Sequence, residues 1–285
     1  MKRQNLIGLS LCGLIFFGGF LIKGSVIFYF NIASLMIVAG GSAIAALLSF
    51  QLERLKIVQR VVRSSYTGQL KSEAEIVDIL INLAIKSRME GILSLQQDES
   101  ETSILFLRRA LGCLVDKYEP QQIRDILNTE MYFFKMRRED SERVLRTIAD
   151  FCPAFGIVGS VAGLIPMLAG IDDTGIILKT VPLALTSILY GLIFANFFFI
   201  PFAANLRERT NQELLLQKII MEGIIGIECE LNPTVLRTKL LSFLTPSDRK
   251  ADLTPLSLIQ ERFHIVVDDQ MDQDDHGSRP GPAAY

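Results

Sequence analysis

Two apolar stretches within residues 151–209 constrain this chain more than any other feature. Residues 151–170 and 180–206 contain no Asp, Glu, Lys or Arg. Each stretch is long enough to cross a bilayer core of roughly 30 Å. A short acidic turn at residues 172–173 joins them, and charged side chains occur only at their borders. The pair therefore predicts two membrane-spanning helices with a tight connection between them.

Small residues recur at helical spacing on both stretches, which gives each helix one small, faintly polar face. In lipid such faces allow close packing, so simple helix–helix contact is one interpretation. The other is that the hydroxyls of Ser160, Thr186 and Ser187 line an ion path. A hydroxyl cannot carry a proton at neutral pH as a carboxylate does. Any proton-accepting group of such a path would therefore come from another chain.

The first fifty residues predict a second pair of spans. The apolar run 6–22 is followed almost at once by the run 26–50, with only Lys23-Gly24-Ser25 between them. A cleaved signal peptide would show a shorter apolar core and a small-residue cleavage site, so a transmembrane hairpin is favoured. The second run leads into residues 53–56, which we interpret as an amphipathic continuation of the same helix.

The predicted fold class is an all-α membrane protein. Four transmembrane helices carry a large helical cytoplasmic segment between helices 2 and 3, and a helical region follows helix 4. The long segment is rich in Arg and Lys, whereas the short loops are nearly free of them, so both termini are expected in the cytoplasm. The expected parts are a hairpin (1–50), the cytoplasmic segment (51–149), helices 3 and 4 (150–205), cytoplasmic helices (206–246) and an acidic disordered tail (247–285).

Within the cytoplasmic segment, apolar residues at 76, 79, 80, 83 and 84 have the spacing of an amphipathic helix, which Gly91 is expected to end. Residues 96–102 are expected to form a polar, acidic turn. Pro120 fits the first turn of a later helix, where its missing N–H costs little.

Composition excludes several classes of function. A net charge of -2 argues against nucleic-acid binding. The four cysteines form no CxxC pair, and the two histidines lie in or near the tail, so neither a zinc site nor a histidine-based catalytic centre is expected. The sequence has no phosphate-cradling glycine loop and no nucleophile elbow. We therefore expect no enzyme and no cofactor.

Several segments resemble the flagellar stator protein MotA and its sodium-type counterpart PomA. They are residues 153–160 (PAFGIVGS), 189–201 (LYGLIFANFFFIP), 34–41 (SLMIVAGG), 220–224 (IMEGI) and 239–244 (KLLSFL). The resemblance extends from residue 5 to about residue 245, in the same order. The related ExbB and TolQ proteins have a single span before the cytoplasmic segment, so the initial hairpin favours the stator branch.

The resemblance implies a homo-oligomeric ring of five subunits in the bacterial inner membrane. The ring would surround two copies of a MotB- or PomB-like partner, a single-span peptidoglycan-binding protein that carries the essential Asp. Ion flow would turn the ring, and its cytoplasmic helices would push the rotor protein FliG during motility and chemotaxis. This agrees with the absence of a carboxylate from the apolar stretches.

The resemblance also assigns roles to individual residues. Pro153 and Pro201 match two prolines that couple ion flow to torque, although each could instead mark a helix boundary. Arg88 matches the rotor-facing arginine. The family's paired glutamate is Gln96 here, so Glu90, Asp98 or Glu99 would have to supply the negative charge.

The resemblance implies a transported H+ or Na+ and leaves the coupling ion open, with a slight preference for Na+. Ser160 occupies a position where sodium-type members usually have Thr and proton-type members often have Ala. Ile188 replaces a family threonine, with Thr186 and Ser187 just ahead of it.

Two other readings remain. The chain could energise a non-flagellar envelope machine, or it could be a passive membrane scaffold. A neighbouring gene for a single-span protein with an intramembrane Asp and a peptidoglycan-binding domain would favour the stator.

Overall fold

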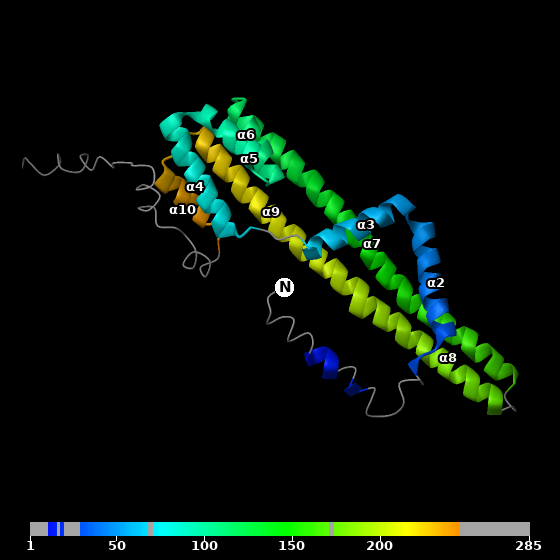
Figure 1. Cartoon of the computed structure of the whole chain (residues 1–285). Helices are drawn as coiled ribbons and strands as arrows, with labels where there is room; N and C mark the ends of the chain where they lie inside the picture. Colours follow the sequence, from blue (N-terminus) through cyan, green and yellow to red (C-terminus); the bar gives the residue numbers. More distant parts are fainter. Residues whose placement is uncertain (1–10, 16–17, 20–28, 68–70, 171–173, 245–285) are drawn as a thin grey trace, which may run out of the picture. The chain divides into compact units, whose positions relative to one another are not determined.

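The computed structural model describes residues 11–15, 18–19, 29–67, 71–170 and 174–244, and every regular element within them is helical (Figure 1). This confirms the predicted all-α class. The chain divides into two compact units. The first unit comprises residues 1–69 and 132–212, and the second comprises residues 70–131 and 213–285. Helices α7 (Pro120–Ala169) and α9 (Ile200–Glu228) contribute residues to both units.

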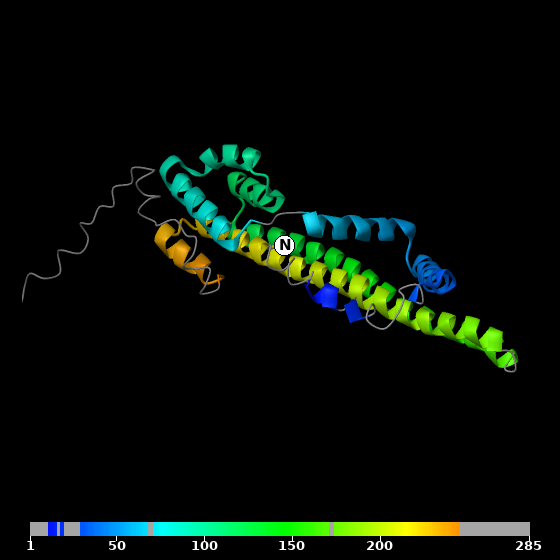
Figure 2. The same cartoon turned by 60° about the horizontal axis from the view of Figure 1, so that its bottom comes forward.

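In the first unit, α2 (Ile32–Ser49) packs on α8 (Thr174–Ile193), and α7 and α8 run side by side (Figures 1 and 2). The side chain of Asn31 starts α2, because its Oδ1 accepts a hydrogen bond from the Ser34 N–H at 3.2 Å. A small apolar core holds α3 (Leu52–Thr67) against α7 and α9. Its buried members are Val58, Val144, Leu145, Ala203 and Leu206.

Among the described residues, three helical stretches are long and apolar enough to cross a membrane: Ile32–Ser49, Pro120–Ala169 and Thr174–Glu228. Many of their large apolar side chains, among them Met36, Leu48 and Ile165, are exposed in the single subunit. Such exposure is what helices surrounded by lipid or by neighbouring subunits require. The expected first span, residues 6–22, lies mostly outside the described residues, and the tail 247–285 lies wholly outside them.

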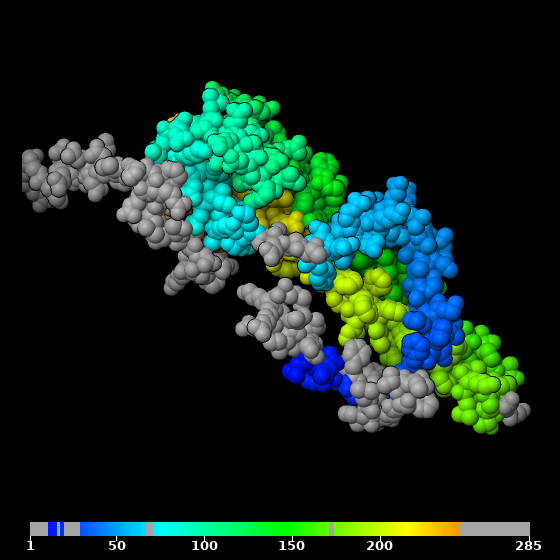
Figure 3. All heavy atoms as spheres, in the orientation of Figure 1, coloured from blue at the N-terminus to red at the C-terminus, as the bar shows by residue number. Residues whose placement is uncertain are grey.

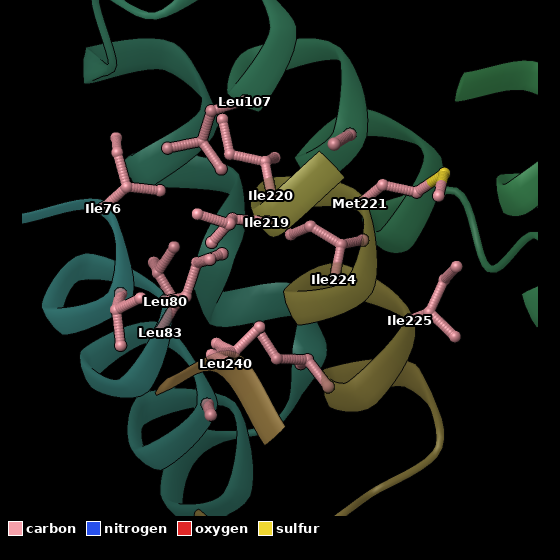
Figure 4. Close-up of a cluster of buried hydrophobic side chains, with 14 of the residues drawn as sticks. Ile76, Leu80, Leu83, Leu107, Ile219, Ile220, Met221, Ile224, Ile225 and Leu240 are labelled. Carbon is pink, nitrogen blue, oxygen red and sulfur yellow. The ribbon is translucent and has the colours of Figure 1, made fainter. Parts of the chain in front are cut away.

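The second unit is a helical bundle around one apolar core. It contains α4 (Glu73–Glu90), η2 (Ile92–Ser94), α5 (Leu95–Glu101), α6 (Leu105–Val115), α10 (Pro233–Leu241) and the adjoining ends of α7 and α9. Figure 4 shows Leu80 and Leu83 of α4 directed toward Ile219 and Ile224 of α9. The spheres of α4 to α6 form one continuous surface of this unit (Figure 3).

Local sequence signals set the helix ends in this bundle. The Ser72 hydroxyl caps α4 by accepting from the Glu75 N–H at 3.1 Å. Gly91 ends α4 with a φ of 83°, a conformation that side chains other than glycine rarely adopt, and α7 begins at Pro120. The predictions for Gly91 and Pro120 are therefore confirmed.

Two local predictions were wrong. α2 does not continue into the charged residues 53–56, because Phe50 is extended (φ -136°, ψ 142°) and α3 begins as a separate helix. The polar residues 96–102 do not form a turn, because Leu95–Glu101 is helical. Leu95 is fully buried and anchors this short helix to the core, which outweighs its polar composition.

A π-helical segment, η3 (Phe194–Phe199), joins α8 to α9. The Ile200 N–H donates to the Ala195 carbonyl, five residues back, where an α-helix would use the carbonyl four residues back. Pro201 follows directly and has no N–H to donate. The widened turn therefore lies immediately before a proline.

Candidate functional site

The hydroxyl of Thr186 lies between α2 and α8. Thr186 Oγ1 lies 2.7 Å from the Pro182 carbonyl oxygen and 2.8 Å from Ser34 Oγ of α2, and Ser34 Oγ lies 2.9 Å from the Leu183 carbonyl oxygen. Each hydroxyl has one proton, so one of the two donates to its carbonyl and the other donates across to the partner hydroxyl. Both side chains are buried, at 5% and 0% exposure. The pair joins two apolar helices through a polar contact that has no access to water in the single subunit.

Ser34 was not predicted as a site residue, and only its place in the 34–41 segment drew attention to it. Its partner Thr186 is 152 positions away, so no local pattern could reveal the pair. A second polar link was missed for the same reason. The Tyr190 hydroxyl donates to the Tyr29 carbonyl at 2.6 Å and accepts from the Asn31 N–H at 2.9 Å.

The structure brings Ser187 to the contact between α7 and α8. Its hydroxyl donates to the Leu183 carbonyl at 2.8 Å, and its Oγ lies 2.7 Å from where a Cβ on Gly159 would stand. The backbones also touch at Gly191, where a Cβ would lie 2.6 Å from the Cys152 carbonyl oxygen. The small-residue faces therefore pack the two helices closely, as the packing interpretation predicted.

Ser160 belongs to the same buried region, at 8% exposure. Within the described part of the chain, its hydroxyl makes no hydrogen bond to another residue. Of the three predicted path residues, Thr186 and Ser187 already use their hydroxyls within the subunit. Ser160 is thus the one of the three whose hydroxyl proton is not used within the described residues, while the oxygens of all three keep lone pairs.

This hydroxyl region can do limited chemistry. Hydroxyl and carbonyl oxygens can replace part of an ion's hydration shell, but they cannot accept a proton at neutral pH. Among the described residues, no group of three or more His, Cys, Asp or Glu side chains could hold a metal ion.

The two predicted coupling prolines both lie inside continuous helical stretches. Pro153 is within α7, and Pro201 is the second residue of α9, directly after η3. Pro153 does not mark a helix boundary, so that interpretation was wrong for it, whereas Pro201 lies where the π-helical segment gives way to α9. Each lacks the N–H that would complete the helical ladder, which leaves a place where the helix can bend.

The predicted rotor-facing residues lie in the second unit, where they fall into two groups. Arg88 and Glu90, at the end of α4, line a pocket of about 610 Å³. Asp98 is not among its lining residues, and its carboxylate pairs with Lys86 at 2.6 Å. The hydrogen bond from the Lys86 ammonium to Asp98 raises the pKa of Lys86 and outweighs burial, which lowers it. Gln96 is exposed on α5, outside the pocket lining.

A buried ion cluster stabilises the same unit. Glu222 of α9 is 7% exposed and accepts from Arg124 at 2.9 Å and from Lys239 of α10 at 2.7 Å, with Lys218 at 3.6 Å. Burial raises the pKa of Glu222, but the hydrogen bonds and charges of Lys239 and Arg124 outweigh it and lower that pKa. The cluster ties α7, α9 and α10 together within the unit.

Comparison with known proteins shows which family this chain resembles. Residues 97–218 match the model of the MotA/TolQ/ExbB proton channel family. Motility protein A of Treponema pallidum is 31% identical over 241 residues, covering 82% of this chain and 93% of that protein. Chemotaxis protein PomA of Vibrio alginolyticus is 28% identical over 251 residues, covering 86% and 98%.

Solved structures agree with these relatives. The fold is similar to the structure of C. jejuni MotAB, with a TM-score of 0.81 and 25% identity over 89% of this chain and all of that one. It is also similar to the flagellar MotAB stator complex of Bacillus subtilis, with a TM-score of 0.79 and 26% identity over 86% and 96%. From its helices, its buried hydroxyls and these relatives, we conclude that the chain belongs to the MotA/TolQ/ExbB proton channel family, on the branch of the motility proteins.

Proposed function

We propose that this chain is the ring-forming subunit of a flagellar stator that converts ion flow into torque. The observation that supports this most is the pairing of buried hydroxyls with charge-free apolar stretches. Ser160, Thr186 and Ser187 offer oxygens to an ion, yet residues 151–170 and 180–206 contain no carboxylate. Such a path is incomplete until a second protein supplies a proton-accepting group.

The partner that fits is a MotB- or PomB-like protein with a single span that carries an Asp. Several copies of this chain, five by family analogy, would surround two such partners. The exposed apolar faces of α2, α7 and α8 would then be covered by lipid, by neighbouring subunits and by the partner's helix.

The topology of the proposal has four spans in the inner membrane, with both termini in the cytoplasm. The second unit, which contains Arg88 and Glu90, would lie on the cytoplasmic side and push the rotor protein FliG. Its described core is apolar and well packed, so it can carry a load between the membrane helices and a rotor.

The first test is the swimming of a strain that lacks this gene, with filaments counted by microscopy. We expect filaments that do not rotate, with rotation restored by the gene. Normal swimming would contradict the proposal. The gene of the partner protein would then show whether the chain serves a non-flagellar envelope machine instead.

A second test addresses the ion path directly. Because the Ser160 hydroxyl is not used within the described residues, Ser160→Ala should change how swimming speed depends on sodium or proton concentration. The matched control is Ser65→Ala, which removes a buried hydroxyl of the same unit that is already bonded to the Val61 carbonyl in α3. If swimming speed depends on ion concentration identically in the wild type and in Ser160→Ala, Ser160 only packs against its neighbours.

A further inference from the structure

The face of α3 that points away from its core carries a basic stripe. This stripe consists of Lys56, Arg60 and Arg63, which follow one another at intervals of four and three residues and are all exposed. The opposite face of the helix, centred on the buried Val58, packs against α7 and α9. Four basic side chains against one acidic side chain, that of Glu53, give α3 a net charge of +3.

The basic stripe lacks an electrostatic counterpart in the subunit. Neither Lys56 nor Arg60 forms an ion pair or a hydrogen bond within the described residues. Like charges four residues apart on a helix repel one another and destabilise it. A run of basic residues that keeps this repulsion, directly after a membrane-spanning helix, is typical of helices that bind anionic lipids.

The position of α3 is fixed at both of its ends. Only two residues, Phe50 and Gln51, separate it from α2, and this link can extend no more than about 10 Å. At the other end, the Arg209 guanidinium donates to the Ser65 carbonyl at 2.9 Å and ties the last turn of α3 to α9. Figures 1 and 2 both show α3 turning away from the direction of α2. Since α2 is long and apolar enough to cross a membrane, α3 begins at the membrane surface.

Apolar side chains flank the basic stripe. Leu52 and Ile57 are 62% and 52% exposed. Tyr66 is 47% exposed, and its ring packs edge-on against Phe202 with 5.8 Å between the ring centroids. A helix that combines basic residues with exposed apolar and aromatic side chains suits the headgroup region of a bilayer, where both kinds of side chain find partners. An acidic protein segment would match the charges of this helix but not its apolar side chains.

We propose that α3 binds anionic lipid headgroups through Lys56 and Arg60, with Arg63 beside them. The ligand is a phospholipid of net negative charge, because a zwitterionic headgroup adds a positive group that the stripe repels. Headgroup binding relieves the repulsion along the stripe and holds α3 at the bilayer surface. The inference goes beyond the proposed function, since it assigns a ligand to α3 whichever machine the chain drives.

The test is a lipid titration of the full-length protein in detergent, followed by native mass spectrometry. Phosphatidylglycerol and phosphatidylcholine are added separately, and the wild type should bind phosphatidylglycerol more tightly. Lys56→Gln combined with Arg60→Gln should weaken that binding by up to about 30-fold, because each basic residue near an anionic surface contributes about tenfold or slightly less. Binding of phosphatidylcholine should not change. Lys56→Arg combined with Arg60→Lys keeps both charges and should bind like the wild type.

The matched control is Arg108→Gln combined with Arg109→Gln, which removes two exposed basic side chains from α6 of the second unit. It should bind phosphatidylglycerol like the wild type. Equal binding of the two lipids by the wild type, or unchanged phosphatidylglycerol binding after Lys56→Gln and Arg60→Gln, would overturn the inference. Phosphatidylglycerol binding that begins only when residues 247–285 are removed would overturn it too, and would assign the stripe to that acidic tail. The proposed function is tested separately, by the swimming of the deletion strain.

Discussion

Replacing Glu222 by Gln should loosen the second unit, and the structure allows the size of the effect to be worked out. Each charge-assisted hydrogen bond, from Arg124 and from Lys239, contributes about 1.5–3 kcal/mol in favourable settings. The two cations are 35% and 40% exposed and can regain water, and Gln keeps one acceptor. We therefore expect a loss of about 2 kcal/mol in the free energy of local opening, which is less than the ~3–5 kcal/mol of breaking a fully buried ion pair.

Cys113 provides the assay. Its thiol is partly buried against the core that contains Ile220 and Leu240, and burial raises its pKa, so local opening increases the labelling rate. A loss of about 2 kcal/mol should increase the labelling rate of Cys113 by up to about 30-fold at pH 7 in the full-length protein. Peptide mass spectrometry separates this thiol from the other three. Glu119→Gln, an exposed change, should leave the rate unchanged.

The pH dependence of the Glu222→Gln effect provides the test that could refute this reasoning. The pKa of Glu222 is lowered in the folded protein, so its contribution is present above the ordinary value of 4.5 and is lost as the pH falls through the lower folded value. The difference between wild type and Glu222→Gln in the free energy of opening should close in that acid range. Equal labelling rates at pH 7, or a difference that persists in acid, would refute the reasoning.

Three further outcomes are expected. Gly191→Ala should lower the amount of folded protein in the membrane, because its Cβ would lie 2.6 Å from a backbone oxygen of α7. Gly40→Ala, whose Cβ would have nothing within 4 Å, should leave that amount unchanged, and immunoblots of membranes measure both. Thr186→Val and Ser34→Ala should each cost about 1 kcal/mol in thermal unfolding, and a double-mutant cycle should show less than additive loss. Arg88→Glu should abolish rotation while leaving membrane levels unchanged, because an exposed charge reversal seldom unfolds a helix; loss of the protein would count against a rotor role.

Local sequence patterns predicted the helices of this fold, but they did not predict which helices pack against one another. The spacing of apolar residues along α4 and the stop at Gly91 act over a few positions, so both could be predicted. The break at Phe50 could not, because residues 26–56 are compatible with an uninterrupted helix and only tertiary packing turns the chain there. Leu95 shows the converse, since one fully buried side chain keeps a polar segment helical.

The candidate site was predicted in the same partial way. Helical spacing identified Ser160, Thr186 and Ser187 as members of small faces. It could not show that Thr186 bonds across to Ser34, because that contact depends on how α2 and α8 pack. The same holds for the pocket beside Arg88, where Glu230 approaches from a helix more than a hundred positions away.

The widened turn at Phe194–Phe199 has a consequence for aligning this chain with its relatives. A π turn accommodates one residue more than an α turn, and one residue corresponds to about 100° of rotation around a helix. In a relative without this π-helical segment, Pro201 and the residues after it would lie on a different face of the helix, even where the two sequences align without a gap. Equivalent positions before and after residues 194–199 must therefore be assigned by superposing each side separately, not by counting along a single helical wheel.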